Sequence, residues 1–159
     1  MSFRVGLGFD THQFADGRDL ILGGIKIEHH QGLKGHSDAD VLCHAITDAI
    51  LGALALGDIG THFPDTDLAY KNADSIELLK KANSLINKKA YSITNIDSTV
   101  IAEKPKLLPY IEQIQNRIAE ALGLRSGQVS VKATTSEKMG YVGRGEGINA
   151  QAIVLIQKT

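Results

Sequence analysis

At 159 residues, with 43% hydrophobic and 22% charged side chains, the chain is long enough for one globular domain and too short for two ordinary ones. Its net charge of −1 and its lack of any run of Lys or Arg argue against nucleic acid or an anionic membrane surface as a partner. The longest apolar run, over 49–56, is too short to cross a bilayer. The lone cysteine, Cys43, excludes an internal disulfide bond and fits a reducing compartment, which we expect to be the bacterial cytoplasm.

The first predicted element is a half-buried strand over 3–12, where apolar and polar side chains alternate. Asp10 and His12 are two residues apart, so they point the same way from the end of this strand. Such a pair is common by chance. Together with one more histidine it would form a three-ligand zinc site with an open fourth position, as catalytic zinc requires.

After a predicted short hairpin over 20–28, a helix is predicted from about Ser37 to about Leu56, where apolar residues recur at helical spacing. Ser37 or Asp38 is the expected N-cap, because either side chain can accept a hydrogen bond from the first turn. His44 lies on a polar stripe of this helix and is the best candidate for the third zinc ligand. A single histidine near a helix start is more often a surface residue, so this assignment depends on the pair in the first strand.

The loop over 57–67 follows this helix and carries Asp58, His62, Asp65 and Asp67 among glycines and a proline. This composition is typical of a solvated turn. Loops of the same kind also hold substrate hydroxyl groups beside metal sites. The loop composition favours neither interpretation over the other.

Two more amphipathic helices and three more strands are predicted along the rest of the chain, the helices over 75–86 and 110–122 and the strands over 93–103, 129–134 and 148–156. We therefore expect an α+β sandwich of the ferredoxin-like type, in which a mixed four-stranded sheet has helices on one face. The strands over 93–102 and 148–156 carry aliphatic side chains on both sides. This pattern predicts that the second face of the sheet packs on another subunit.

Phosphate-binding groups follow the strand over 129–134. Thr134, Thr135 and Ser136 offer three hydroxyl groups, and Glu137 offers a carboxylate for a hard cation such as Mg²⁺ that bridges a diphosphate. The glycine-rich segment over 140–147 lets backbone N–H groups and the guanidinium of Arg144 approach an anion. Each of these patterns is common in proteins when it occurs alone. With the zinc triad and without a strong nucleophile, they indicate phosphoryl chemistry in which a substrate oxygen or water attacks.

Five motifs resemble the 2-C-methyl-D-erythritol 2,4-cyclodiphosphate synthase family, in order and at the expected spacing: Asp10-Thr11-His12, the run from His36 to His44, and the segments over 63–67, 105–109 and 134–147. The resemblance covers essentially the whole chain and implies a single domain over 1–159. It implies a homotrimer with active sites between neighbouring subunits. The implied reaction converts 4-diphosphocytidyl-2-C-methyl-D-erythritol 2-phosphate into the cyclic diphosphate and releases CMP, in the non-mevalonate route to isoprenoids.

The resemblance also implies residue roles. Asp10, His12 and His44 would bind Zn²⁺, Glu137 would hold Mg²⁺ or Mn²⁺ between the phosphates, and His36 and Thr135 would stabilise the transition state. The implied substrate-binding residues fall into four groups: His36 and Ser37 at the phosphates; Asp58, Gly60, Phe63, Asp65 and Asp67 at the methylerythritol; Ala102, Lys106, Leu107, Leu108, Ala133, Thr134 and Thr135 at the cytidine diphosphate of the adjacent subunit; and Glu137, Tyr141 and Arg144 as further contacts. A metal-dependent phosphohydrolase of a related diphosphate, with water as the nucleophile, is the alternative. A zinc-stabilised trimeric binding protein without activity is the third interpretation.

Overall fold

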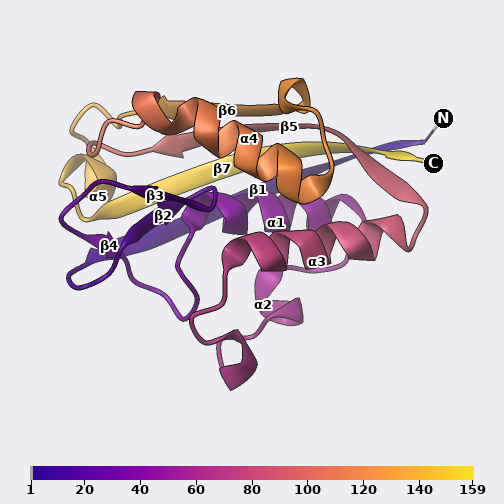
Figure 1. The fold of residues 1–159 in the computed structure, drawn as a ribbon, viewed down its shortest axis with the longest axis horizontal. Coiled ribbons are helices and arrows are strands. Elements are labelled where there is room, and N and C mark those ends of the chain that lie inside the picture. Colours follow the sequence, from indigo (N-terminus) through magenta and orange to yellow (C-terminus); the bar gives the residue numbers. More distant parts are fainter. Residues whose placement is uncertain (1) are drawn as a thin grey trace.

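A computed structural model describes residues 2–159 and shows a mixed five-stranded sheet with helices packed against it (Figure 1). Its strand order is β4 (Gly32–Leu33), β1 (Phe3–Ala15), β7 (Gly147–Lys158), β5 (Tyr91–Ile101) and β6 (Val129–Thr134). The β5–β6 pair is parallel and the other pairs are antiparallel. The four long strands are those predicted. The sheet has one strand more than predicted, because the two-residue β4 pairs with the extended end of β1.

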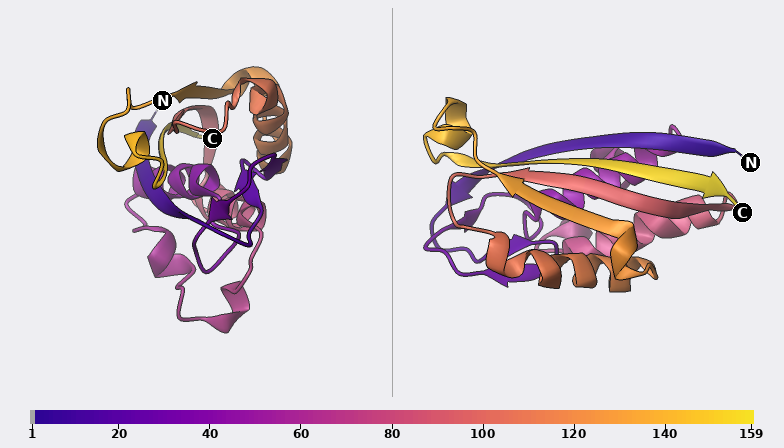
Figure 2. Two further views of the ribbon diagram at one scale, coloured as in Figure 1. Left: turned by 90° about the vertical axis from the view of Figure 1, so that its left-hand side faces the viewer. Right: turned by 90° about the horizontal axis from the view of Figure 1, so that it is seen from above.

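Three long helices cover one face of this sheet: α1 (Val41–Ala53), α3 (Ser75–Asn87) and α4 (Ile111–Leu122). Figure 2 shows them on the same side of the strands, which confirms the predicted α+β sandwich. The shorter elements are β2 (Leu20–Leu22), β3 (Ile25–Ile27), α2 (Ile59–His62), η1 (Leu68–Tyr70), η2 (Leu108–Tyr110), η3 (Ser126–Gln128) and α5 (Gly140–Gly143). None of the helices formed by residues 2–159 has the length and apolar character that a bilayer crossing requires.

Helix α1 begins later than predicted, and its N-cap is Asp40. The carboxylate of Asp40 accepts the N–H of Cys43 at 3.0 Å and also the N–H groups of Gly23 and Gly24 at 2.9 and 2.7 Å. The two glycine amides come from the turn of the β2–β3 hairpin, and both donate to this one carboxylate. These contacts stabilise the carboxylate of Asp40 at the start of α1, and the left-handed backbone of Ala39 (φ 57°) keeps the preceding residues out of the helix.

The buried side of β1 is its glycine side. A Cβ atom built on Gly6 would lie 1.8 Å from the carbonyl oxygen of Ala49, and one on Gly8 would lie 1.7 Å from that of Ala45. The backbone of α1 therefore rests directly on β1, which only glycine allows. The alternating apolar residues that predicted a half-buried strand instead point to the opposite face of the sheet.

That opposite face is apolar and exposed in the single chain. Its large side chains are Phe3, Val5, Leu7, Phe9 and Ile153, each between 49% and 68% exposed. Leu7 and Ile153 are paired across β1 and β7, so the side chains form one surface. A surface of this kind on a globular protein is typical of an interface, and it is the face for which the sequence predicts another subunit.

Candidate functional site

Asp10 and His12 from β1 and His44 from α1 converge on one point. Oδ2 of Asp10 lies 2.9 Å from Nε2 of His12 and 3.1 Å from Nδ1 of His44, and the two ring nitrogens lie 3.1 Å apart. The fold thus brings the three predicted ligands together. Tetrahedral zinc bound at about 2.0–2.1 Å keeps its ligand atoms about 3.4 Å apart, within about 0.5 Å of these separations. One carboxylate oxygen and two imidazole nitrogens also form a donor set of the kind that zinc prefers.

The close contact of β1 with α1 creates this convergence. Gly8, Asp10 and His12 are every second residue of β1, so all three lie on the face of the sheet that α1 covers. The carbonyl of Ala45 lies against Gly8, and His44 is the residue before it. The glycine at position 8 therefore sets the distance between the histidine of the helix and the ligands of the strand.

Hydrogen bonds hold both imidazole rings on the side away from the triad. Nδ1 of His12 lies 2.8 Å from the carbonyl oxygen of Lys34, which can only accept, so Nδ1 carries the hydrogen and Nε2 keeps a lone pair for a metal. Nε2 of His44 lies 2.9 Å from Oγ of Ser75 and 3.2 Å from Oγ of Ser37. Sequence patterns do not reveal Ser75, because it comes from α3 and meets His44 only in the folded chain.

The electrostatics of the triad favour a bound cation. Burial alone would raise the pKa of the Asp10 carboxyl, but hydrogen bonds with His12 and His44 hold it well below its usual range. Burial would lower the pKa of His12, but the hydrogen bond to Asp10 and the charge of that carboxylate raise it above the ordinary 6.5. Asp10 is therefore ionised at neutral pH and offers a negative charge to a cation.

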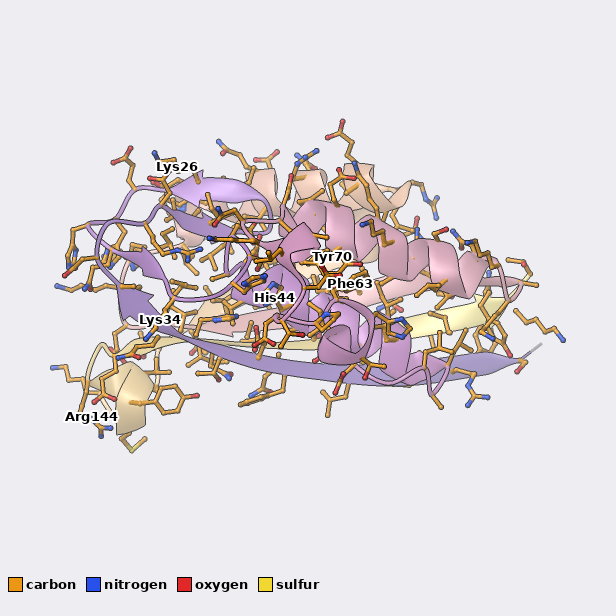
Figure 3. All side chains as sticks on the ribbon, turned by 90° about the horizontal axis from the view of Figure 1, so that it is seen from below. Lys26, Lys34, His44, Phe63, Tyr70 and Arg144 are labelled. Carbon is orange, nitrogen blue, oxygen red and sulfur yellow. The ribbon has the colours of Figure 1, made fainter. Side chains whose placement is uncertain are left out.

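A cavity of about 400 Å³ opens beside the triad. Figure 3 shows His44, Phe63 and Tyr70 of its wall close together. The lining residues are Asp10, His12, Gly35, His36, Ser37, His44, Ile59, Gly60, Phe63, Pro64, Asp65, Tyr70 and Leu78. Both predicted phosphate-side residues, and three of the five predicted methylerythritol-side residues, thus share one cavity with the predicted metal ligands. Sequence reasoning missed Tyr70, whose ring packs edge-on against Phe63 with centroids 5.5 Å apart.

Asp58 and Asp67 do not line this cavity. Asp58 is the N-cap of α2, where hydrogen bonds from the hydroxyl and N–H of Thr61 lower the pKa of its carboxyl. Asp67 is the N-cap of η1 and accepts the N–H of Ala69 at 2.9 Å, while its carbonyl oxygen lies 3.1 Å from Nε2 of His36. Both aspartates therefore shape the loop, and Asp67 also orients His36.

A second cavity, of about 200 Å³, contains the residues predicted to bind cytidine diphosphate. Its lining residues are Ala102, Glu103, Pro105, Lys106, Leu107, Leu108, Ala133, Thr134 and Thr135. The loop after β5 and the end of β6 form it, since these neighbouring parallel strands end at the same edge of the sheet. No residue lines both this cavity and the one beside the triad.

The last three predicted site residues line neither cavity. Glu137 lies in a left-handed turn (φ 53°), and its N–H is 3.2 Å from Oγ1 of Thr135. The hydroxyl of Tyr141 is 3.2 Å from Oγ1 of Thr11. Arg144 pairs with Glu146 at 2.6 Å and lies at one end of the molecule, well apart from His44 in Figure 3.

Comparison with known proteins gives consistent matches over nearly the full chain. The model of the YgbB family matches residues 3–157. A Bacillus subtilis (strain 168) protein named 2-C-methyl-D-erythritol 2,4-cyclodiphosphate synthase is 59% identical over 156 residues, which cover 98% of this chain and 99% of that protein. A protein of the same name from Alkaliphilus metalliredigens is 58% identical over 153 residues, 96% of each chain.

Solved structures are similar as well. The bifunctional IspDF from Campylobacter jejuni has a TM-score of 0.96 and 46% identity; the match covers 99% of this chain and 43% of that one. IspF from Plasmodium falciparum, solved as a CDP complex, has a TM-score of 0.87 and 37% identity, covering 99% of this chain and 97% of that one.

Proposed function

The chain belongs to the YgbB family of 2-C-methyl-D-erythritol 2,4-cyclodiphosphate synthases, and from this premise we propose its reaction. It converts 4-diphosphocytidyl-2-C-methyl-D-erythritol 2-phosphate into 2-C-methyl-D-erythritol 2,4-cyclodiphosphate and CMP, as a lyase of the non-mevalonate route to isoprenoid precursors. The observation that carries this proposal is the convergence of Asp10, His12 and His44 beside a cavity large enough for a phosphorylated sugar alcohol.

In this proposal Asp10, His12 and His44 hold one Zn²⁺, and Glu137 holds one Mg²⁺ or Mn²⁺. When bound, these cations would supply positive charge that neutralises the phosphates. The three zinc ligands come from β1 and α1, so the zinc site would be rigid. Glu137 lies on an exposed turn, so its carboxylate would be open to a cation that enters with the substrate.

In this proposal the side chains beside the triad position the phosphates. Oγ of Ser37 accepts the N–H of Ala39 at 3.2 Å, so its own hydrogen is free to donate to a phosphate oxygen. His36 is oriented by the carbonyl of Asp67, and with Thr135 it would stabilise charge as the 2-phosphate oxygen attacks the β-phosphorus and CMP leaves. Cys43 takes no part, because burial in α1 raises the pKa of its thiol and keeps it uncharged.

We propose a homotrimer in which the cavity beside the triad meets the cytidine-binding cavity of a neighbouring subunit. Within one chain these cavities share no lining residue, whereas the substrate carries its methylerythritol and its cytidine at opposite ends of one diphosphate. The apolar surface of Phe3, Val5, Leu7, Phe9 and Ile153 supports subunit contacts on the open face of the sheet. In this assembly residues 1–159 act as one domain. The lone buried Cys43 and the bacterial relatives support a bacterial cytoplasmic location.

Phosphorus NMR of the purified protein with substrate, Zn²⁺ and Mg²⁺ tests the reaction. The expected products are the cyclic diphosphate and CMP. A linear phosphate product would instead establish the phosphohydrolase, and binding without turnover would establish a ligand-binding protein. Sedimentation of the same sample tests the trimer independently of the products.

A further inference from the structure

The hydroxyl of Ser75 connects α1 to the start of α3. Ser75 is fully buried, and its Oγ lies 2.9 Å from Nε2 of His44, the ring nitrogen that faces away from the metal triad. The same Oγ also forms a hydrogen bond with Oδ1 of Asp38. Oδ2 of Asp38 accepts the backbone N–H of Ser75 at 3.0 Å. A continuous chain of hydrogen bonds therefore runs from Asp38 through Ser75 to His44.

The direction of this chain follows from the chemistry of its members. A carboxylate only accepts hydrogen bonds, so the Ser75 hydroxyl donates its single hydrogen to Asp38. The oxygen of Ser75 must then accept from His44, which places the ring hydrogen on Nε2. Nδ1 of His44 consequently keeps its lone pair on the side of Asp10, which lies 3.1 Å away.

We infer that Asp38 and Ser75 are positioning residues that fix the tautomer and the ring orientation of His44 for metal binding. The inference deepens the proposed zinc site and rests on it. It gives Asp38 and Ser75 a role in metal binding, in addition to their part in holding the start of α3. Hydrogen-bond partners of this kind raise the basicity of a ligating histidine, and their loss typically lowers metal affinity by about 10- to 100-fold.

The backbone beside Asp38 is held in an unfavourable conformation that supports this role. Ala39 is fully buried with φ at 57°, in the left-handed region that a residue with a Cβ atom rarely adopts. Hydrogen bonds from the N–H of Ala39 to Ser37 and from the N–H of Asp40 to Asp38 stabilise this turn. The turn places Asp38 against Ser75 and Ser37 against His44, so one strained residue orients both contacts of the ring.

The Ser75 hydroxyl is not the group that caps the N-terminus of α3. The N-cap of α3 is Asp74, whose side chain accepts the N–H of Ile76 at 2.9 Å. Ser75→Ala therefore removes the contact with His44 and leaves the cap in place. Asp74→Ala does the reverse, which makes it a matched control at the same helix start.

The test is zinc affinity, measured by chelator competition on the full-length protein. Ser75→Ala should weaken zinc binding by about 10- to 100-fold, and Ser75→Thr, which keeps the hydroxyl, should restore most of it. Asp74→Ala should lower the thermal midpoint but leave zinc affinity within about threefold of the unaltered protein, because it makes no contact with the ring. Zinc binding by Ser75→Ala as tight as in the unaltered protein would overturn the inference.

A second measurement needs no variant. Long-range ¹H–¹⁵N NMR of the zinc-loaded protein should show His44 with its hydrogen on Nε2, and a hydrogen on Nδ1 would overturn the inference even where a Ser75 variant fails to fold. Neither measurement uses turnover. If Ser75→Ala keeps its zinc affinity while the unaltered protein still forms the cyclic diphosphate, the inference is wrong and the proposed function stands. If the zinc measurements agree with the inference while another product forms, the inference stands and the proposed function is wrong.

Discussion

Gly8→Ala tests whether the contact of β1 with α1 sets the metal triad. The new Cβ atom would lie 1.7 Å from the carbonyl oxygen of Ala45, and real Cβ atoms essentially never come within 3.0 Å of such an atom. The helix must therefore move away from the strand by about 1.3 Å or more. Because His44 precedes Ala45, this shift separates it from Asp10 and His12 by a similar distance.

The expected effects of this substitution concern both stability and function. Overpacking of this kind costs about 1–3 kcal/mol of unfolding free energy, which lowers the thermal midpoint by about 2–4 °C per kcal/mol in a chain of this size. A misplacement of about 1 Å at a reacting centre is enough to lower turnover by about 100-fold. Zinc affinity should fall as well, since Nδ1 of His44 now lies 3.1 Å from the ligand atoms of Asp10 and His12, and the shift would carry it beyond the separation of about 3.4 Å that tetrahedral zinc keeps.

Calorimetry, chelator competition and turnover measure the three quantities on one sample. Gly127→Ala is the matched control, because a Cβ atom there meets nothing within 4 Å, and it should leave all three unchanged. Wild-type zinc affinity and thermal midpoint in Gly8→Ala would refute the argument that this glycine sets the geometry of the triad.

Three further predictions concern the core, the pH dependence and the second cation. Asp40→Ala should lower the unfolding free energy by about 3 kcal/mol in denaturant titrations, because two buried N–H groups, of Gly23 and Cys43, and the half-buried N–H group of Gly24 lose their acceptor. A loss below about 1 kcal/mol would contradict this. Zinc binds neutral imidazole, and the pKa of His12 is raised above the ordinary 6.5, so protons should compete with zinc for this ring already near neutral pH. Chelator competition should therefore show zinc affinity falling as the pH decreases through neutrality. An affinity independent of pH between 6 and 8 would contradict the assignment of His12. Glu137→Gln should raise the Mg²⁺ concentration needed for half-maximal turnover without changing zinc affinity, and an unchanged Mg²⁺ titration would remove Glu137 from the site.

Short-range patterns predicted much of the candidate site. Asp10 and His12 are two residues apart on a strand, so their common direction follows from strand geometry. The third ligand, His44, follows from helical periodicity and the need for a further donor near the strand end. The motif resemblance then divided the substrate-binding residues into groups, and the structure places most of the phosphate, methylerythritol and cytidine groups around two separate cavities.

Contacts between distant segments explain what the sequence analysis missed. The cap at Asp40 depends on amides of Gly23 and Gly24, which the helix pattern does not contain. The role of Ser75 depends on the meeting of α3 with α1. The inward side of β1 was also unpredictable from alternation, because close backbone packing on glycine reverses the usual rule that the larger apolar side chains face the core.

In the proposed trimer, each active site would combine the metal triad of one subunit with the cytidine-binding cavity of the next. Mixing subunits that carry His44→Ala with subunits that carry Thr135→Ala tests it most directly, since each variant alone should be inactive. In randomly mixed trimers, about a quarter of the interfaces should join an intact triad to an intact cavity, so about a quarter of the wild-type cyclic diphosphate production should return. Mixed trimers that form but stay inactive would contradict an active site shared between subunits.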